Sequence, residues 1–126
     1  MQVKSVVAAG LGLCMVIPAL ADPPAVTIAR FENGAVFITG AGKSLYVRDG
    51  DDGGHGCMDK CLTGWQPLSA DRDDAGPAGW SVIRRPEGSF QWAYMDRPLY
   101  ICDKDATPGG VACDGADNGR WHVARP

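Results

Sequence analysis

The sequence repeats one ordered pattern of residues, and this repetition constrains the fold more than any other feature. The pattern runs Leu-Tyr, Asp, Asp, Cys, Trp and recurs at an offset of 54 residues, which becomes 56 after a two-residue insertion. A pattern that recurs within one short chain indicates two related structural units. We therefore expect two halves, at about 26–68 and 80–123, in one domain. The matched pairs are Leu45 with Leu99, Tyr46 with Tyr100, Asp49 with Asp103, Asp51 with Asp105, Cys57 with Cys113, and Trp65 with Trp121.

Length and composition fit a single small β domain. The chain has 126 residues, enough for one hydrophobic core and too few for two ordinary domains. Seventeen Gly and nine Pro indicate many turns, while four Trp, three Tyr and three Phe supply the bulk of a core. We expect this core to be aromatic and to contain Trp65, Trp92, Trp121, Tyr46 and Tyr100.

Short runs of β-branched and aromatic residues predict antiparallel strands. Residues 26–31 and 35–39 flank Asn33-Gly34, which is a strong hairpin signal. In the second half, residues 80–84 and 90–94 flank a Pro-Glu-Gly-Ser turn, and 90–94 alternates large apolar with polar or small residues. The remaining predicted strands are 45–47, 99–101 and 121–123. The expected fold class is all-β, a small antiparallel domain made of two pseudo-equivalent units.

The first 21 residues have the pattern of an export signal peptide. Lys4 precedes an apolar run, Pro18 ends that run, and Ala19-Leu20-Ala21 has the small-residue spacing of a cleavage site. The run is shorter than the roughly 20 residues that a membrane-spanning helix needs. We expect a leader at 1–21 and a mature domain at 22–126 that has no transmembrane segment and is soluble in the periplasm or outside the cell.

The charge balance disfavours nucleic acid as a partner. Twelve Lys and Arg against fifteen Asp and Glu give a formal net charge of −3. Proteins that bind nucleic acids or anionic membranes usually present an excess of cations. The expected partner is therefore an unidentified protein or small ligand.

Four cysteines remain once the expected leader is removed, and export to an oxidising compartment lets them pair. Four cysteines allow three connectivities, which sequence alone does not separate. We favour the two local pairs, because the second of them brackets a Thr-Pro-Gly-Gly turn that brings its flanks together. These pairs are Cys57 with Cys61 and Cys102 with Cys113.

The assembled motifs resemble the bacterial secreted-repeat family, lipoproteins of unknown function with a Tyr-x-aromatic-x-x-Asp motif. The resemblance extends from residue 40 to residue 126. Two features depart from the family pattern: the aromatic position is Arg48 in the first motif and Cys102 in the second, and a lipid-attachment cysteine is absent. The resemblance implies a fold type and no activity. The matching segments are 45–51, the Cys57 and Cys61 pair leading to 65–68, Gly88 with Gln91, 98–105 and 119–123.

The repeated motif residues are Tyr46 with Asp51 and Tyr100 with Asp105. A carboxylate at the end of a strand accepts hydrogen bonds from the amides of the following loop, and a Tyr hydroxyl ties its strand to a neighbour. A feature used twice in pseudo-symmetric positions is more easily explained by folding than by a single active site. Ligand or ion binding is the alternative for the same residues.

A second alternative centres on a segment rich in soft ligands. His55, Cys57, Met58 and Cys61 offer imidazole, thiolate and thioether groups, which select copper or zinc. Closely spaced cysteines also exchange disulfides when one thiol has a lowered pKa. Both uses require reduced thiols, whereas an even cysteine count in an exported chain favours disulfides.

No catalytic pattern stands out. The serines lie in no nucleophile-elbow motif, and His55 and His122 have no evident triad partners. The function we expect is an exported, non-catalytic binding or envelope-associated module of unknown ligand that uses no cofactor. The alternative is a periplasmic copper, zinc or thiol-redox protein.

Overall fold

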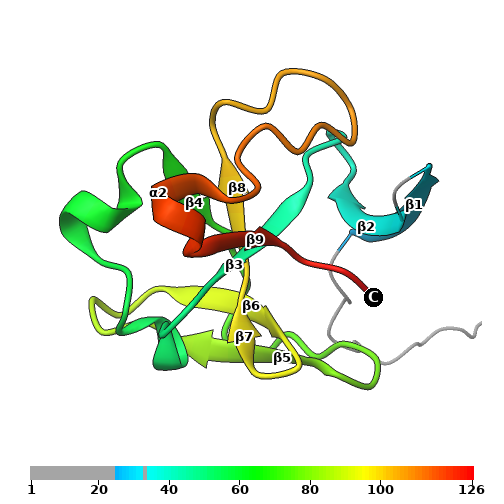
Figure 1. The fold of residues 1–126 in the computed structure, drawn as a ribbon. Coiled ribbons are helices and arrows are strands. Elements are labelled where there is room, and N and C mark those ends of the chain that lie inside the picture. Colours follow the sequence, from blue (N-terminus) through cyan, green and yellow to red (C-terminus); the bar gives the residue numbers. More distant parts are fainter. Residues whose placement is uncertain (1–24, 33) are drawn as a thin grey trace, which may run out of the picture.

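The computed structural model describes residues 25–32 and 34–126, so the expected leader at 1–21 lies outside the described residues. The regular secondary structure of the described chain consists of antiparallel strands with a few short helical turns, which confirms the expected fold class (Figure 1). The strands are β1 (Val26–Phe31), β2 (Gly34–Thr39), β3 (Leu45–Arg48), β4 (Trp65–Pro67), β5 (Trp80–Arg84), β6 (Phe90–Tyr94), β7 (Arg97–Pro98), β8 (Tyr100–Cys102) and β9 (Trp121–Val123). The short helical turns are η2 (Asp52–Gly54), η3 (Asp59–Leu62) and α2 (Ala116–Gly119).

Two of these strands have no counterpart among the predicted runs. Both contain a proline, Pro67 in β4 and Pro98 in β7, which cannot donate a hydrogen bond to a neighbouring strand. Both also lie at the edge of their sheets, where such a residue is tolerated. The repeat itself indicates β4, because Trp65 aligns with Trp121, the first residue of the predicted strand 121–123.

The central sheet has the strand order β4-β8-β3-β9 and relates the two halves by an approximate two-fold axis. The axis passes between β3 and β8, where Tyr46 lies opposite its own repeat equivalent, Tyr100. The outer pairs follow the same relation: Tyr46 pairs with Val123 as Tyr100 pairs with Pro67. Equivalent residues of the repeat therefore occupy equivalent places in the sheet.

Backbone hydrogen bonds just beyond the strands repeat in the same way. The amide of Ala124 donates to the carbonyl of Leu45 at 2.7 Å, and that of Leu68 donates to Leu99 at 2.9 Å. In both cases the donor and the acceptor of one bond map onto those of the other at the repeat offsets.

Two hairpins flank the central sheet, with β1–β2 on one side and the β5-β6-β7 sheet below it in Figure 1. Each hairpin precedes the central strand of its own half. Among the described residues, no helix is long and apolar enough to span a membrane.

Side chains alternate across the central strands, and both faces of the sheet are buried. On β3, Leu45 and Val47 enter one apolar cluster, while Tyr46 enters the other. Strands of a sheet that is covered on both faces need not alternate apolar with polar residues, which explains why Leu45, Tyr46 and Val47 are apolar or aromatic in succession. Of the five aromatic residues expected in the core, Trp92, Trp121, Tyr46 and Tyr100 are buried, and Trp65 is half-buried.

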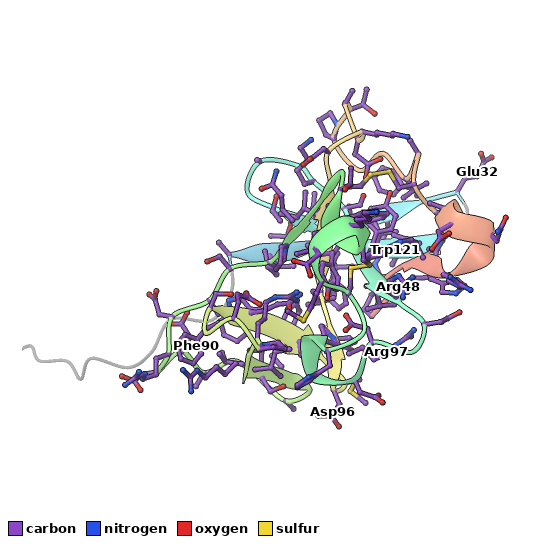
Figure 2. All side chains as sticks on the ribbon, turned by 90° about the vertical axis from the view of Figure 1, so that its left-hand side faces the viewer. Glu32, Arg48, Phe90, Asp96, Arg97 and Trp121 are labelled. Atoms are coloured by element: carbon purple, nitrogen blue, oxygen red, sulfur yellow. A yellow bond between two sulfur atoms is a disulfide. The ribbon has the colours of Figure 1, made fainter. Side chains whose placement is uncertain are left out.

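Trp65 and Trp121 stack face to face across the repeat. Their ring centroids lie 3.6 Å apart with an interplanar angle of 7°. Each ring also meets a motif tyrosine edge-on at 5.1 Å, Trp65 meeting Tyr46 and Trp121 meeting Tyr100. On the outer side, the Arg48 guanidinium lies 5.8 Å from the Trp121 ring (Figure 2). The stack joins the two halves at the edge of the aromatic cluster.

The turn between β6 and β7 holds two non-glycine residues in the left-handed region. Met95 has φ 50° and Asp96 has φ 66°. Asp tolerates this region, whereas a side chain such as Met costs roughly 1–2 kcal/mol there. The Met95 side chain is 63% exposed, so packing returns little of that cost.

Replacing Met95 with Gly should raise the free energy of unfolding by about 0.5–1 kcal/mol, because glycine adopts positive φ without strain. Urea unfolding followed by Trp fluorescence measures the change. Met95→Ala is the control and should give no gain, since it shortens the side chain but keeps the Cβ. Equal stabilisation by both variants would contradict the strain at this turn.

Candidate functional site

The four repeat-motif side chains meet in the buried centre, and their hydrogen bonds cross between the two halves. Tyr46 Oη donates to Asp105 Oδ2 at 2.7 Å, and Tyr100 Oη donates to Asp51 Oδ2 at 2.5 Å. The tyrosine of each motif thus bonds to the aspartate of the other motif. Both tyrosines are fully buried, and the aspartates are 6% and 2% exposed.

The second oxygen of each carboxylate holds the loop that follows its strand. Asp51 Oδ1 accepts the amide of Gly56 at 3.0 Å, and Asp105 Oδ1 accepts the amide of Ala112 at 2.9 Å. Gly56 and Ala112 are equivalent in the repeat, and each directly precedes a repeat cysteine. Each aspartate therefore links a loop of its own half to a tyrosine of the other half.

The buried environment keeps both motif tyrosines protonated. Burial is the main cause, and the hydrogen bond to Asp51 adds to it; together they raise the pKa of Tyr100 to about 12. Burial, followed by the bond to Asp105, raises the pKa of Tyr46 as well. Near neutral pH the two hydroxyls act as hydrogen-bond donors inside the fold and do not act as bases.

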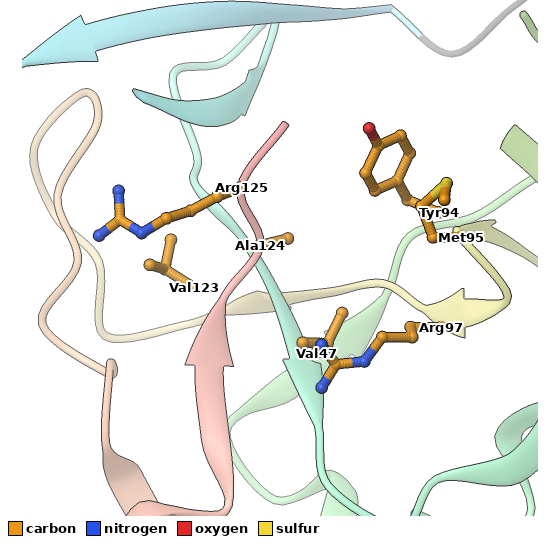
Figure 3. Close-up of a pocket in the computed structure, with 7 residues that line it drawn as sticks. All are labelled: Val47, Tyr94, Met95, Arg97, Val123, Ala124 and Arg125. Atoms are coloured by element: carbon orange, nitrogen blue, oxygen red, sulfur yellow. The ribbon is translucent and has the colours of Figure 1, made fainter. Parts of the chain in front are cut away.

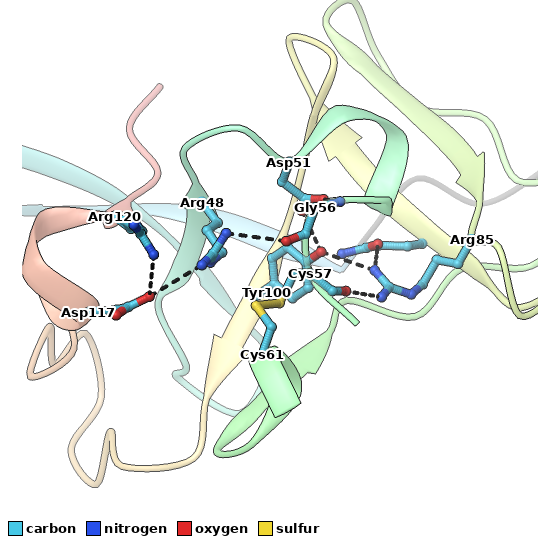
Figure 4. The surroundings of a disulfide bond; sticks show 10 residues. Arg48, Asp51, Gly56, Cys57, Cys61, Arg85, Tyr100, Asp117 and Arg120 are labelled. Carbon is cyan, nitrogen blue, oxygen red and sulfur yellow. Dashed lines mark hydrogen bonds and ion pairs between the residues drawn. A yellow bond between two sulfur atoms is a disulfide. The ribbon is translucent and has the colours of Figure 1, made fainter. Parts of the chain in front are cut away.

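A buried arginine that no sequence motif indicates, Arg85, completes the network in the second half (Figure 4). The side chain of Arg85 is fully buried after β5, and its Nη1 donates to Tyr100 Oη at 3.0 Å and to Gln91 Oε1 at 2.7 Å. Its Nη2 donates to the carbonyl of Cys57 at 2.6 Å. Its Nε pairs with the half-exposed Glu87 at 3.2 Å. The guanidinium therefore connects the second hairpin to the cysteine loop of the first half.

No feature of the sequence separates Arg85 from its exposed neighbour Arg84. Its partner Gln91 lies in a run whose alternation predicts large apolar side chains inside. In the structure Gln91, Trp92 and Ala93 are all buried. Burial of the polar Gln91 is possible because its amide accepts a hydrogen bond from Arg85 and donates one to the carbonyl of Leu99 at 2.7 Å. The first half has Phe31 at the position equivalent to Arg85, so this cation breaks the symmetry.

The disulfides are the two local pairs, Cys57–Cys61 and Cys102–Cys113. Cys57 is buried and Cys61 is partly exposed, while His55 lies exposed at the end of η2. In the disulfide form, the sulfurs of Cys57 and Cys61, which the copper or zinc alternative needs as ligands, are bonded to each other. Within the described ranges, no group of three or more His, Cys, Asp or Glu side chains is arranged to hold a metal ion.

A polar pair on the surface also occurs twice. His122 Nε2 lies 3.0 Å from Asp49 Oδ2, and Gln66 Nε2 donates to Asp103 Oδ1 at 2.6 Å. Gln66 and His122 are repeat equivalents, as are the two aspartates. The hydrogen bond from His122 lowers the pKa of Asp49. His122 is half-exposed and makes the same kind of surface hydrogen bond as the equivalent Gln66. This contact explains its position without a catalytic role.

Among known protein families, one that is described as a secreted repeat of unknown function matches residues 81–125. The matched segment runs from β5 to just beyond β9 and contains Arg85, Gln91, Tyr100 and Asp105. It confirms the resemblance to the secreted-repeat family, while residues 40–80, which carry the other motif, lie outside the match. No curated protein and no solved structure matches the chain.

Replacing Arg85 with Ala should lower the free energy of unfolding by about 2–6 kcal/mol, because two buried acceptors, Gln91 Oε1 and the carbonyl of Cys57, lose their donor at a cost of about 1–3 kcal/mol each. Arg84→Ala is the matched control, since Arg84 is the adjacent residue and is exposed; it should change stability by no more than about 0.5 kcal/mol. Urea unfolding of the oxidised protein compares the two. A similar small effect for both would contradict the role of Arg85.

The raised pKa of Tyr100 also predicts alkaline destabilisation. In the unfolded chain a tyrosine ionises near its ordinary pKa of about 10, whereas folded Tyr100 holds its proton up to about 12. Its contribution is therefore complete below pH 10 and is lost as the pH rises towards 12. Tyr100→Phe should flatten the fall of unfolding free energy over this window, by at most about 1.4 kcal/mol per pH unit. An unchanged slope in urea unfolding between pH 9 and 11.5 would contradict this.

Proposed function

We propose that this chain is an exported, non-catalytic binding module that acts in the periplasm or outside the cell. The observation that carries the proposal is the crossed network of Tyr46, Asp51, Tyr100 and Asp105. These polar residues recur in the repeat, and each is buried and engaged with the other half. The repeated signature is thus accounted for by folding, which leaves recognition to the surface of the domain.

Export is supported by three separate features. Residues 81–125 match a family of secreted repeats. Residues 1–21 have the composition of a cleavable leader. The four remaining cysteines form two disulfides, which persist in oxidising compartments and are rare where thiols are kept reduced.

The surroundings of the histidines support the absence of catalysis. Among the described residues His122 hydrogen-bonds to Asp49, and the equivalent pair is formed by Gln66 with Asp103, where the amide of Gln66 cannot take the place of a histidine in acid–base chemistry. His55 lies exposed at the end of η2. An activated nucleophile needs a base within hydrogen-bond reach, and neither histidine provides one in the described structure.

We further propose that the module works without a cofactor. The alternative copper or zinc set depends on Cys57 and Cys61 as thiolates, because thiolate is the form that ligates soft metals. The disulfide between them supports the metal-free proposal.

Intact mass spectrometry of the periplasmically expressed protein tests the proposal. We expect a chain that begins at Asp22, is four hydrogens lighter than its fully reduced form, resists alkylation before reduction, and carries no metal in the native spectrum. Alkylation of Cys57 and Cys61 without reduction, or a stoichiometric copper or zinc mass, would replace the binding module with the metal or thiol-redox alternative.

A further inference from the structure

The two-fold relation between the halves extends to two surface pockets. One, which we name the Arg97 pocket, has a volume of about 300 Å³ and lies beside β3, the β6–β7 turn and the C-terminal segment (Figure 3). The other, which we name the Lys43 pocket, has a volume of about 370 Å³ and lies beside β8 and the segment that joins β2 to β3. Val47 and Arg97 line the first, and their repeat equivalents Ile101 and Lys43 line the second.

The correspondence covers nearly the whole lining. At the repeat offsets, six of the seven residues of the Arg97 pocket have an equivalent in the Lys43 pocket. The two pockets therefore follow from the repeated architecture, because each half forms a concave surface at the equivalent position. The remaining equivalent pairs are Tyr94 with Gly40, Met95 with Ala41, Ala124 with Leu68, and Arg125 with Ser69.

The pockets differ in the cations that they offer to a ligand. Lys43 Nζ donates to the carbonyl of Asp105 at 2.5 Å, and Ser69 adds no charge, so the cation of the Lys43 pocket is already used within the fold. The Arg97 pocket carries two arginines. Arg97 is 51% exposed and makes only a loose contact of 3.6 Å with Asp49. Arg125 donates through Nη1 to the carbonyl of Ala35 at 3.0 Å, and its side chain points away from Arg97, Tyr94 and Met95 (Figure 3), so Arg97 is the cation that a ligand would meet.

The floor of the Arg97 pocket is apolar. Val47, Val123 and Ala124 form it with exposed fractions of 4%, 7% and 5%, and the side chains of Tyr94 and Met95 stand at one side (Figure 3). An apolar floor beneath a few polar groups is the common composition of small-molecule sites.

Met95 supplies an independent reason to regard this pocket as functional. It is the most exposed large apolar residue among those described, and it lies in the left-handed region at φ 50°. The two-residue turn that Tyr94 and Arg97 close requires a positive φ at both central residues, which favours Gly, Asn or Asp. An exposed Met at this place serves neither the turn nor the core, which leaves its side chain available to a ligand.

We propose that the Arg97 pocket binds a small organic anion, a carboxylate with a compact apolar body. The carboxylate pairs with the guanidinium of Arg97, because a planar guanidinium group matches a carboxylate in shape and charge. The apolar body covers Val47 and Ala124 and contacts Met95. This inference rests on the proposed binding function and names the class of its ligand.

Titration of the ¹⁵N-labelled mature chain with phenylacetate, followed by amide chemical shifts, tests the site. We expect saturable shifts at Val47, Met95 and Ala124, and none with the uncharged phenylacetamide. Arg97→Gln should weaken phenylacetate binding at least tenfold. Lys43→Gln is the matched control from the equivalent pocket and should leave the affinity unchanged.

Four outcomes would overturn the site: no saturable shifts in the unaltered protein, equal binding of the amide, shifts confined to the Lys43 pocket, or unchanged affinity in Arg97→Gln. Each leaves the proposed function standing, because that proposal is judged by the oxidised, metal-free mass. Free thiols or bound metal would overturn the proposed function whatever the titration shows, so the two failures are distinguishable.

Discussion

The two crossed Tyr–Asp hydrogen bonds are the contacts on which the arrangement of the halves depends. Each motif supplies a donor and an acceptor, but Tyr46 donates to Asp105 and Tyr100 to Asp51, so neither half supplies the acceptor for its own tyrosine hydroxyl. A buried polar group without a partner costs about 1–3 kcal/mol. Separating the halves would strand four such groups at once. The sheet register, with Tyr46 opposite Tyr100, is what brings each hydroxyl to the opposite loop.

The departures from symmetry lie where the two halves have different tasks. Arg85 has no equivalent cation in the first half, and through its contact with the carbonyl of Cys57 it fixes the loop of the other half. Arg97 is open to solvent, whereas the equivalent Lys43 is tied to Asp105. Symmetric contacts thus build the domain. Arg85, which has no equivalent cation, provides a second internal contact, and Arg97, which differs from Lys43 in being half-exposed, provides a surface that can meet an anion.

The sequence predicts most of this fold because its signals are local or repeated. The period-two runs locate the hairpins, and the ordered Leu-Tyr, Asp, Cys and Trp pairs indicate two related halves. The crossing of the bonds is not predictable, since Tyr46 is five residues from Asp51 and 59 from the aspartate that it contacts. Arg85 is hidden for a similar reason: burial of a charge depends on partners such as Gln91 and the Cys57 carbonyl, which only the folded chain brings together.

The most direct test of the crossed arrangement is a pair of double-mutant cycles on unfolding free energy. One cycle combines Tyr46→Phe with Asp105→Ala, and the other combines Tyr46→Phe with Asp51→Ala. The crossed arrangement predicts a coupling of about 1–3 kcal/mol in the first cycle and below about 0.5 kcal/mol in the second. Strong coupling between Tyr46 and Asp51, with none between Tyr46 and Asp105, would mean that each motif closes on itself and would contradict the account.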